Sequence, residues 1–198
     1  YSLDATQWSL LIALSIAIAE VIVATALTNP SIQVHSIVNQ STFLTLSLNI
    51  LALDVGSWLS MRAHFRVSSV VKGEVLRPGL YTMAEDVIAV DACCGTQFRG
   101  RLNERRKASP CFRSLFQKLS FLWTLSGAVV NGACLVISIV AIAIMDGRGD
   151  VGFVIGFTIP YIWILVLIPV SVPMTRRNLR KEKVQLSVGF TTRQEEWC

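Results

Sequence analysis

The chain has 198 residues, of which 53% are hydrophobic and 16% are charged, and its formal net charge is +5. An average soluble domain has about 25% charged residues. The composition therefore excludes intrinsic disorder and disfavours a compact soluble enzyme, which would lack the polar side chains to cover its surface. The class that remains is an integral membrane protein.

Four apolar segments approach the length of about 20 residues that a helix needs to cross the hydrocarbon core. The first and second each contain one acidic residue, whereas the third and fourth contain no charge. Hydrocarbon offers no partners to backbone polar groups, and the segments lack the alternation of a barrel, so we expect helices. The expected spans are residues 10–27, 43–59, 121–144 and 151–172. The predicted fold class is all-α, a polytopic membrane protein with four transmembrane helices.

The basic residues are distributed as four spans require. Seventeen of the 18 Lys and Arg residues lie in the connection 60–120 or in the tail that follows Pro173. Cytoplasmic loops collect Lys and Arg, so we expect the connection, the tail and both termini to be cytoplasmic. The organisation then has four parts: a first transmembrane hairpin (1–60), a basic cytoplasmic loop (61–120), a second hairpin (121–173) and a polybasic cytoplasmic tail (174–198).

The cytoplasmic loop contains a candidate amphipathic helix at about residues 80–91, after the turn Pro78-Gly79. Its apolar residues recur at helical spacing, and its polar residues lie mostly on the other side. The helix is acidic, whereas helices that bind membrane surfaces are usually basic, so we expect it to dock against neighbouring basic elements. The polar residues are Thr82, Glu85, Asp86 and Asp91, and the apolar ones are Leu80, Met83, Ala84, Val87 and Ile88.

Ser109 precedes Pro110, a pattern that is typical of a helix N-cap followed by proline in the first turn. We expect this helix to continue into the third span. Ser109 also follows the basic run 105–108, a spacing that basophilic kinases favour, so Ser109 is a possible phosphorylation site as well.

Residues 85–91 read EDVIAVD, and Phe98-Arg99, Ala108-Ser109-Pro110 and Phe112-Arg113 follow. Together with the PYIW sequence at 160–163, they resemble a group of uncharacterised fungal multi-pass membrane proteins over roughly residues 77–180. That group often has glycines after the last Asp, where this chain has Ala92-Cys93-Cys94-Gly95. The resemblance implies a membrane protein with a cytosolic acidic helix and no known activity.

Two acidic residues, Glu20 and Asp54, lie inside expected spans, where a charge is costly. From the span boundaries they are displaced by roughly 8 Å along the membrane normal, which suits a relay but not a close carboxyl pair. The alternative is that each is hydrogen-bonded to Asn49, Ser or Thr across helices. Asn49 and Asn131 are expected to form interhelical hydrogen bonds.

No enzyme signature is present, and no catalytic residue, cofactor or metal is expected. The pair Cys93-Cys94 has no His or second Cys pair at ligand spacing. The one enzymatic alternative is an acidic cytoplasmic site formed by Glu85, Asp86 and Asp91, although these residues suit salt bridges equally well. The basic partners considered for them are Arg99, Arg101, Arg105 and Arg106.

The predicted function is a non-enzymatic membrane scaffold or interaction protein that engages lipids, particularly anionic ones, or unidentified protein partners. The motivation is the basic tail, in which each basic residue near the membrane can add ~1 kcal/mol of attraction to acidic lipid. Nucleic acid is not an expected partner, because the positive charge lies beside membrane spans. The alternative is a small transporter or channel subunit that uses Glu20 and Asp54. The expected lipid-facing basic residues are Arg176, Arg177, Arg180, Lys181 and Lys183.

Overall fold

The computed structural model describes residues 4–26, 32–91, 95–144 and 149–195. Across these ranges the secondary structure is helical and contains no strand, which agrees with the predicted all-α class. The elements are α1 (Ala5–Ala26), α2 (Ile32–Trp58), α3 (Gly79–Asp86), the π-helical turn η1 (Val87–Asp91), α4 (Gly95–Ala108), α5 (Pro110–Ile144) and α6 (Gly149–Glu195).

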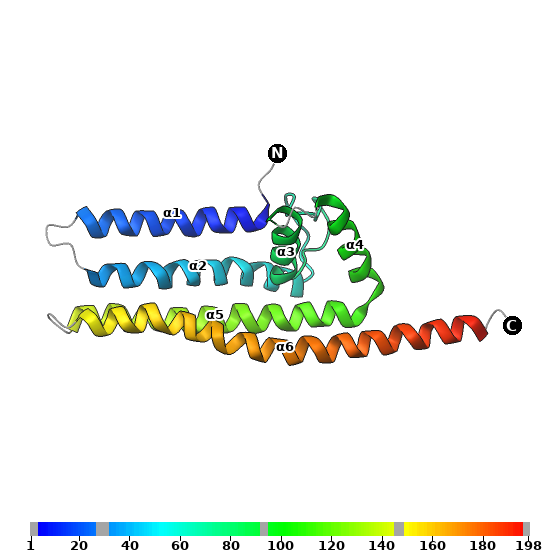
Figure 1. Cartoon of the computed structure of the whole chain (residues 1–198). Helices are drawn as coiled ribbons and strands as arrows, with labels where there is room; N and C mark the ends of the chain where they lie inside the picture. The colour runs from blue at the N-terminus through cyan, green and yellow to red at the C-terminus, as the bar shows by residue number, and fades with distance from the viewer. Residues whose placement is uncertain (1–3, 27–31, 92–94, 145–148, 196–198) are drawn as a thin grey trace.

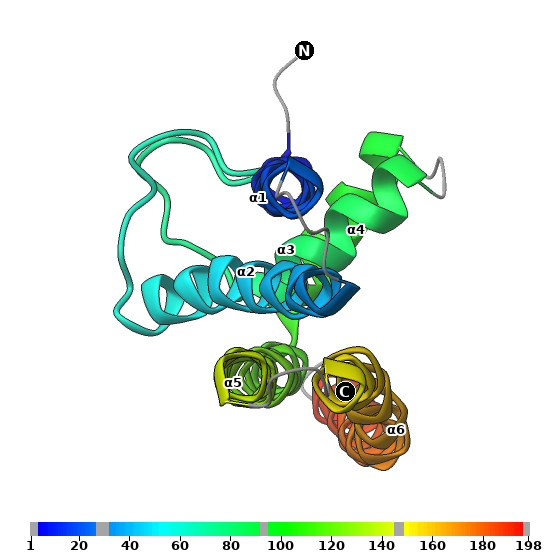
Figure 2. The same cartoon turned by 90° about the vertical axis from the view of Figure 1, so that its left-hand side faces the viewer.

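Four helices, α1, α2, α5 and α6, run alongside one another, and consecutive ones are antiparallel (Figure 1). Viewed end on, α2 lies between α1 and the pair formed by α5 and α6 (Figure 2). The start of α1 and the end of α6 lie at the same end of the bundle as α3 and α4. We call residues 59–91 and 95–108, which cover this end, the cap.

Three helices are long and apolar enough to cross a membrane: α1, residues Pro110–Ala141 of α5 and residues Gly152–Val184 of α6. The central helix α2 is more polar, and four of its polar side chains are buried against the rest of the protein: Gln40, Ser41, Ser47 and Asp54. Many large apolar side chains are exposed on the three outer helices. The hydropathy of each helix thus follows its position in the bundle.

Two helices are longer than the sequence predicts. The expected second span starts at residue 43, but α2 begins at Ile32. Within the expected polybasic tail, residues 174–198, α6 continues to Glu195. The added turns at the start of α2 pack against neighbouring helices, which sustains a polar extension that hydropathy alone does not predict. Residues 121–144 lie within α5, which begins at Pro110 as the N-cap pattern predicts.

Three prolines lie inside α6, at Pro160, Pro169 and Pro173. Each removes a backbone hydrogen bond and crowds the preceding turn, which bends a helix. Figure 1 shows α6 changing direction along this stretch, as the sequence predicts for Pro160 and Pro169.

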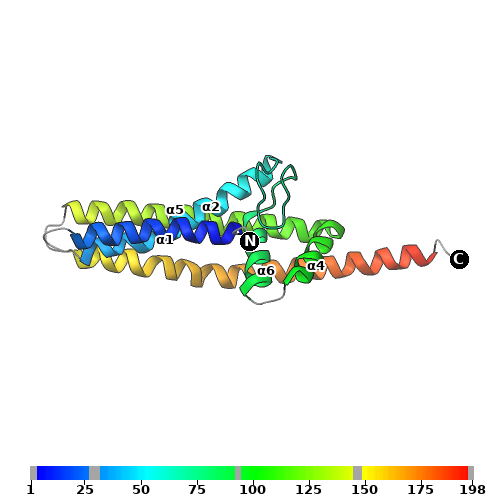
Figure 3. The same cartoon turned by 90° about the horizontal axis from the view of Figure 1, so that it is seen from above.

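The loop 59–78 folds over the end of the bundle. Its buried core is formed by Ala63, Val67 and Val70, against which Ala5 of α1 and Leu53 of α2 pack. The last turns of α2 diverge from α1 towards this loop (Figure 3). The loop therefore fills a wedge between two helices at the cap.

Candidate functional site at the cap

Asp54 of α2 is buried where α2, α3 and α5 meet. Its Oδ1 accepts a hydrogen bond of 2.7 Å from the backbone N–H of Gly79 and another from the hydroxyl of Ser120. The Thr124 hydroxyl donates to Oδ2 over 2.8 Å. The next amide of α3, that of Leu80, donates to the Ser120 oxygen over 2.9 Å. The first amides of α3, which have no partner within their own helix, are thus satisfied by side chains of α2 and α5.

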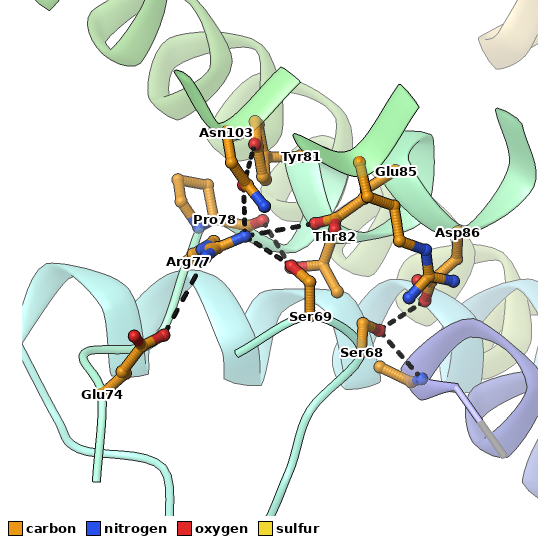
Figure 4. Close-up of polar contacts among 12 residues, drawn as sticks. Ser68, Ser69, Glu74, Arg77, Pro78, Tyr81, Thr82, Glu85, Asp86 and Asn103 are labelled. Carbon is orange, nitrogen blue, oxygen red and sulfur yellow. Dashed lines mark hydrogen bonds and ion pairs between the residues drawn. The ribbon is translucent and has the colours of Figure 1, made fainter. Parts of the chain in front are cut away.

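Glu85 of α3 faces the interior of the cap and is 1% exposed. Its Oε2 lies 3.3 Å from Nη1 of Arg77. The same nitrogen donates to Ser69 Oγ over 2.6 Å and to Asn103 Oδ1 over 2.5 Å. Figure 4 shows Arg77 at the centre of these contacts. Arg77 therefore connects the loop, α3 and α4.

Asp86, also on α3, is 3% exposed and has a separate set of partners. Its Oδ2 accepts hydrogen bonds from the hydroxyls of Ser68, over 2.6 Å, and Thr6, over 3.0 Å. Its Oδ1 lies 3.4 Å from Arg99 Nη2, and the same nitrogen lies 2.8 Å from Asp4 Oδ2. Asp86 thus joins the first turn of α1 to the loop and to α4.

The predicted amphipathic helix turns polar side chains, rather than only its apolar side, toward the rest of the protein. The structure buries Thr82, Glu85 and Asp86 and leaves Val87 and Ile88 exposed. Buried acids are tolerated where cationic and hydroxyl partners compensate for lost water. The expected docking on basic elements is found, with Arg99 as a partner of Asp86, whereas the partner of Glu85 is Arg77, which the sequence does not single out.

Burial determines the protonation behaviour of this cluster. Removal from water raises the pKa of Glu85, even though a hydrogen bond from Ser69 and the charge of Arg77 act in the other direction. Removal from water also raises the pKa of Asp86, against hydrogen bonds from Ser68 and Thr6. Both acids therefore carry a desolvation cost that their neighbours offset only in part.

Tyr81 and Arg106 lie on the α4 side of the same cluster. Burial, followed by the negative charge of Glu85, raises the pKa of Tyr81 to about 12. The Tyr81 hydroxyl donates to Asn103 Oδ1 over 2.7 Å, and the Arg106 guanidinium lies 5.3 Å from the ring centroid. Burial and the nearby charge of Arg77 lower the pKa of Arg106. The charged and polar side chains of this cluster thus connect α3 to α4.

The acidic residues of the cap do not converge on one point. Glu85 is paired with Arg77 and Asp86 with Arg99, and the side chain of Asp91 lies outside the described residues. Among the described residues, no group of three His, Cys, Asp or Glu side chains could hold a metal ion. Cys93 and Cys94 lie outside the described residues. In the described part of the chain, Glu85 and Asp86 thus each form an ion pair with a different arginine.

A second connection joins α4 to α6. Arg105 donates two hydrogen bonds to Glu182, of 3.1 Å from Nε and 2.7 Å from Nη2. The Arg105 guanidinium also lies 4.6 Å from the ring centroid of Phe112 on α5. This two-point contact fixes α6 to the cap about ten residues after the expected end of the fourth span at 172.

Ser109 is the N-cap of α5, as the sequence predicts. Its Oγ accepts a hydrogen bond of 3.2 Å from the Phe112 amide, and its side chain is buried. This burial closes the hydroxyl to a kinase in the conformation described.

The expected lipid-facing basic residues share one face of α6. Successive residues of a helix are about 100° apart, so these five positions span an arc of about 160°. The position of Glu182 lies opposite the centre of that arc, and its side chain is held by Arg105. We call this the basic face; its members, all exposed, are Arg176, Arg177, Arg180, Lys181 and Lys183.

The two acids of the expected spans, Glu20 and Asp54, are hydrogen-bonded to hydroxyl groups on neighbouring helices. This is the arrangement that the sequence analysis gives as the alternative to a relay. Glu20 Oε2 accepts a hydrogen bond of 2.6 Å from Ser41 Oγ. Ser41 is 13 residues from Asp54 along α2, which corresponds to about 20 Å. The expected displacement of roughly 8 Å is therefore wrong, because α2 starts earlier and pairs with α1 in a different register.

The prediction that Asn49 and Asn131 form interhelical hydrogen bonds is also wrong. Asn131 Nδ2 donates to the Gly127 carbonyl of its own helix, and Asn49 Nδ2 is buried without a partner in the described structure. Gln40 performs that role instead, donating to Ser138 of α5 over 2.9 Å. Gln and Asn side chains can both form interhelical hydrogen bonds, so residue type alone does not predict that Gln40, and not the two asparagines, forms one.

The structure thus defines an all-helical protein in which three helices are able to cross a membrane and a polar cap covers one end of the bundle. Residues 1–186 match the family described as Domain of unknown function (DUF8766), and the chain belongs to this family. The resemblance to an uncharacterised family agrees with this match. No curated protein and no solved structure matches the chain.

Proposed function

We propose that the protein is a four-span membrane scaffold without enzymatic activity, whose cap and basic face lie on the cytoplasmic side and whose basic face binds anionic lipid. The proposal combines the three apolar helices, the position of α2 and the geometry of α6. It goes beyond the family match, since the family has no assigned activity.

The position of α2 supports its role as the fourth span. It has 27 residues, which is more than the hydrocarbon core requires. Its buried polar side chains bond to neighbouring helices, as Gln40 does to Ser138 and Asp54 does to Thr124. Such residues are tolerated in membrane helices when they face the bundle. With α2 included, the basic connection and tail fall on one side, which the positive-inside rule assigns to the cytoplasm.

The observation that carries the proposal is the pairing of Glu182 with Arg105. Glu182 is the acid within the basic segment 176–183, and the cap binds it on the side opposite the basic face. The five basic side chains are therefore exposed together without an acid among them. Residue 176 is about one turn beyond the expected end of the span, and a basic face that starts there is within reach of the lipid headgroups in a four-span arrangement.

Lipid enrichment around the protein tests this proposal. The full chain is reconstituted into vesicles of phosphatidylcholine and phosphatidylserine, excised with a styrene–maleic acid copolymer, and its lipids are quantified by mass spectrometry. We expect phosphatidylserine enrichment that falls with salt and is lost in the triple variant Arg176→Gln, Arg180→Gln, Lys183→Gln. The matched control is Arg62→Gln, Lys72→Gln, Lys118→Gln, which removes three exposed charges elsewhere. Equal losses in both variants, or enrichment unaffected by salt, would reject the proposal.

The transporter or channel alternative has less support. Asp54 is surrounded by donors from α3 and α5, which gives it a role in joining helices. Glu20 is bonded to Ser41, which lies about 20 Å from Asp54 along α2. If the double variant Glu20→Gln, Asp54→Asn folds and ion or proton flux in vesicles is unchanged, the alternative should be dropped.

A further inference from the structure

A groove opens between the first turns of α1, the last turns of α2 and the loop 59–78. Its volume is about 490 Å³, and it lies where α2 diverges from α1 (Figure 3). Three segments distant in sequence form it, and its principal lining residues are Trp8, Ile12, Asn49, Leu53, Phe65 and Arg66.

The walls of the groove are apolar and open to the surroundings of the bundle. Trp8 is 52% exposed and Phe65 is 70% exposed. Large aromatic side chains at this level of a membrane protein occupy the boundary between hydrocarbon and headgroups. These walls suit an acyl chain that enters from the bilayer.

Arg66 lies at the polar end of the groove. Its Nε donates to the Ser68 carbonyl over 3.1 Å, which anchors the guanidinium while leaving its side chain exposed. The ion pairs of the described residues involve Arg77, Arg99 and Arg105, so Arg66 is not neutralised by an acid there. A guanidinium presents parallel N–H donors that match a phosphate group.

Asn49 supplies a second, independent sign of a ligand. Its side-chain nitrogen is buried and has no hydrogen-bond partner in the described structure, although Asn49 lines the groove. A buried donor without a partner costs about 1–3 kcal/mol. Because this nitrogen is closed to solvent, an acceptor oxygen of a bound molecule would remove the cost only after the Asn49 side chain turned toward the groove.

We propose that this groove binds one anionic phospholipid, with its phosphate on Arg66, an ester or phosphate oxygen accepting from Asn49, and an acyl chain between Trp8 and Leu53. The charge of Arg66 favours an anionic headgroup, because none of the ion pairs among the described residues includes this side chain. This site is formed by α1, α2 and the loop. It is thus separate from the basic face of α6, which attracts lipid without enclosing it.

Photolabelling of the full chain tests the site. The probe is a phosphatidylserine analogue with a diazirine near the glycerol end of one acyl chain, incorporated into phosphatidylcholine vesicles with the protein. Labelled peptides are mapped by mass spectrometry. We expect labelling concentrated on residues 4–12 and 49–67, and competed by unlabelled phosphatidylserine more strongly than by phosphatidylcholine.

Variants connect the labelling to the proposed contacts. Arg66→Gln should reduce groove labelling roughly tenfold, because a hydrogen bond to a charged group is lost. Asn49→Leu should reduce it less, and Lys72→Gln, an exposed charge in the same loop, should leave it unchanged. Labelling that is spread over α5 and α6, or unaffected by Arg66→Gln, would overturn the proposal. The triple variant of the basic face should leave groove labelling intact, which separates this site from the proposed function.

Discussion

Gly79, the first residue of α3, donates its backbone N–H to the carboxylate of Asp54 on α2 over 2.7 Å. The two residues are 25 positions apart, and the bond joins a helix of the bundle to the first turn of the cap. Ser120 and Thr124 of α5 donate to the same carboxylate. Asp54 is thus one of the points at which the cap is fixed to the bundle.

Asp54→Asn should destabilise this junction, because the amide replaces an acceptor oxygen with a donor that faces other donors. We expect the free energy of unfolding to fall by about 2–3 kcal/mol, the cost of leaving buried donors unpaired. Hydrogen exchange at the Gly79 and Leu80 amides should accelerate. Glu20→Gln is the matched control, since Glu20 is half-buried and accepts one bond from Ser41. Equal losses in the two variants would contradict this role for Asp54.

Gly79 is also the closest approach between α3 and α2. A Cβ on Gly79 would lie 2.5 Å from the carbonyl oxygen of Ile50, and a backbone atom cannot move aside cheaply. Gly79→Ala should therefore lower the free energy of unfolding by about 1–3 kcal/mol. In Gly100→Ala the Cβ would meet nothing within 4 Å, and the helix propensity of alanine should raise stability by up to about 1 kcal/mol. Denaturation in detergent gives both values, and a loss at Gly100 as large as that at Gly79 would argue against this contact.

Arg105 and Glu182 should show energetic coupling. The geometry is two-point and Glu182 is buried, but Arg105 is half exposed, so solvent screens the pair and we expect a coupling of about 1 kcal/mol. A double-mutant cycle of Arg105→Gln and Glu182→Gln measures it. Each single variant should also increase trypsin cleavage at residues 176–183. Additive effects of the two substitutions would show that the contact does not hold α6.

The sequence predicts the helical class because apolar runs and the distribution of basic residues are local properties. Three of the four expected spans coincide with helices long and apolar enough to cross a membrane. The boundaries of α2 are less predictable: the hydroxyl of Ser41 and the amide of Gln40 lower hydropathy, yet both bond to neighbouring helices. Packing, which hydropathy ignores, extends that helix.

The cap could be predicted only in part. Pro78-Gly79 and the apolar spacing indicate α3, and the acidity of the segment indicates basic partners. The partners themselves come from folding, since Thr6 is 80 residues from Asp86 and Asn103 is 26 residues from Arg77. Arg77 lies eight residues before Glu85, and neither spacing nor composition distinguishes it from the other arginines of the loop.

The buried acids of α3 should give the cap a specific dependence on pH. Burial raises the folded-state pKa of Glu85 above its ordinary value of 4.5. At pH values between the ordinary pKa and the raised folded-state pKa, the folded protein retains a proton that the unfolded chain releases. Raising the pH in this range therefore lowers stability. The contribution is fully present below the ordinary value and is lost as the pH rises through the folded-state value. Asp86 acts in the same direction, from an ordinary value of 3.8.

Glu85→Gln removes the titrating group while keeping the shape of the side chain. We expect the stability of the wild type relative to Glu85→Gln, measured by denaturant unfolding in detergent, to decrease as the pH is raised from about 4 to about 7. Asp86→Asn should give a difference of the same sign, and the double variant should lose the part of the pH dependence that both acids supply. A stability difference that instead grows with pH would mean that the charges of Arg77 and Arg99 outweigh burial in setting the pKa values of the two acids.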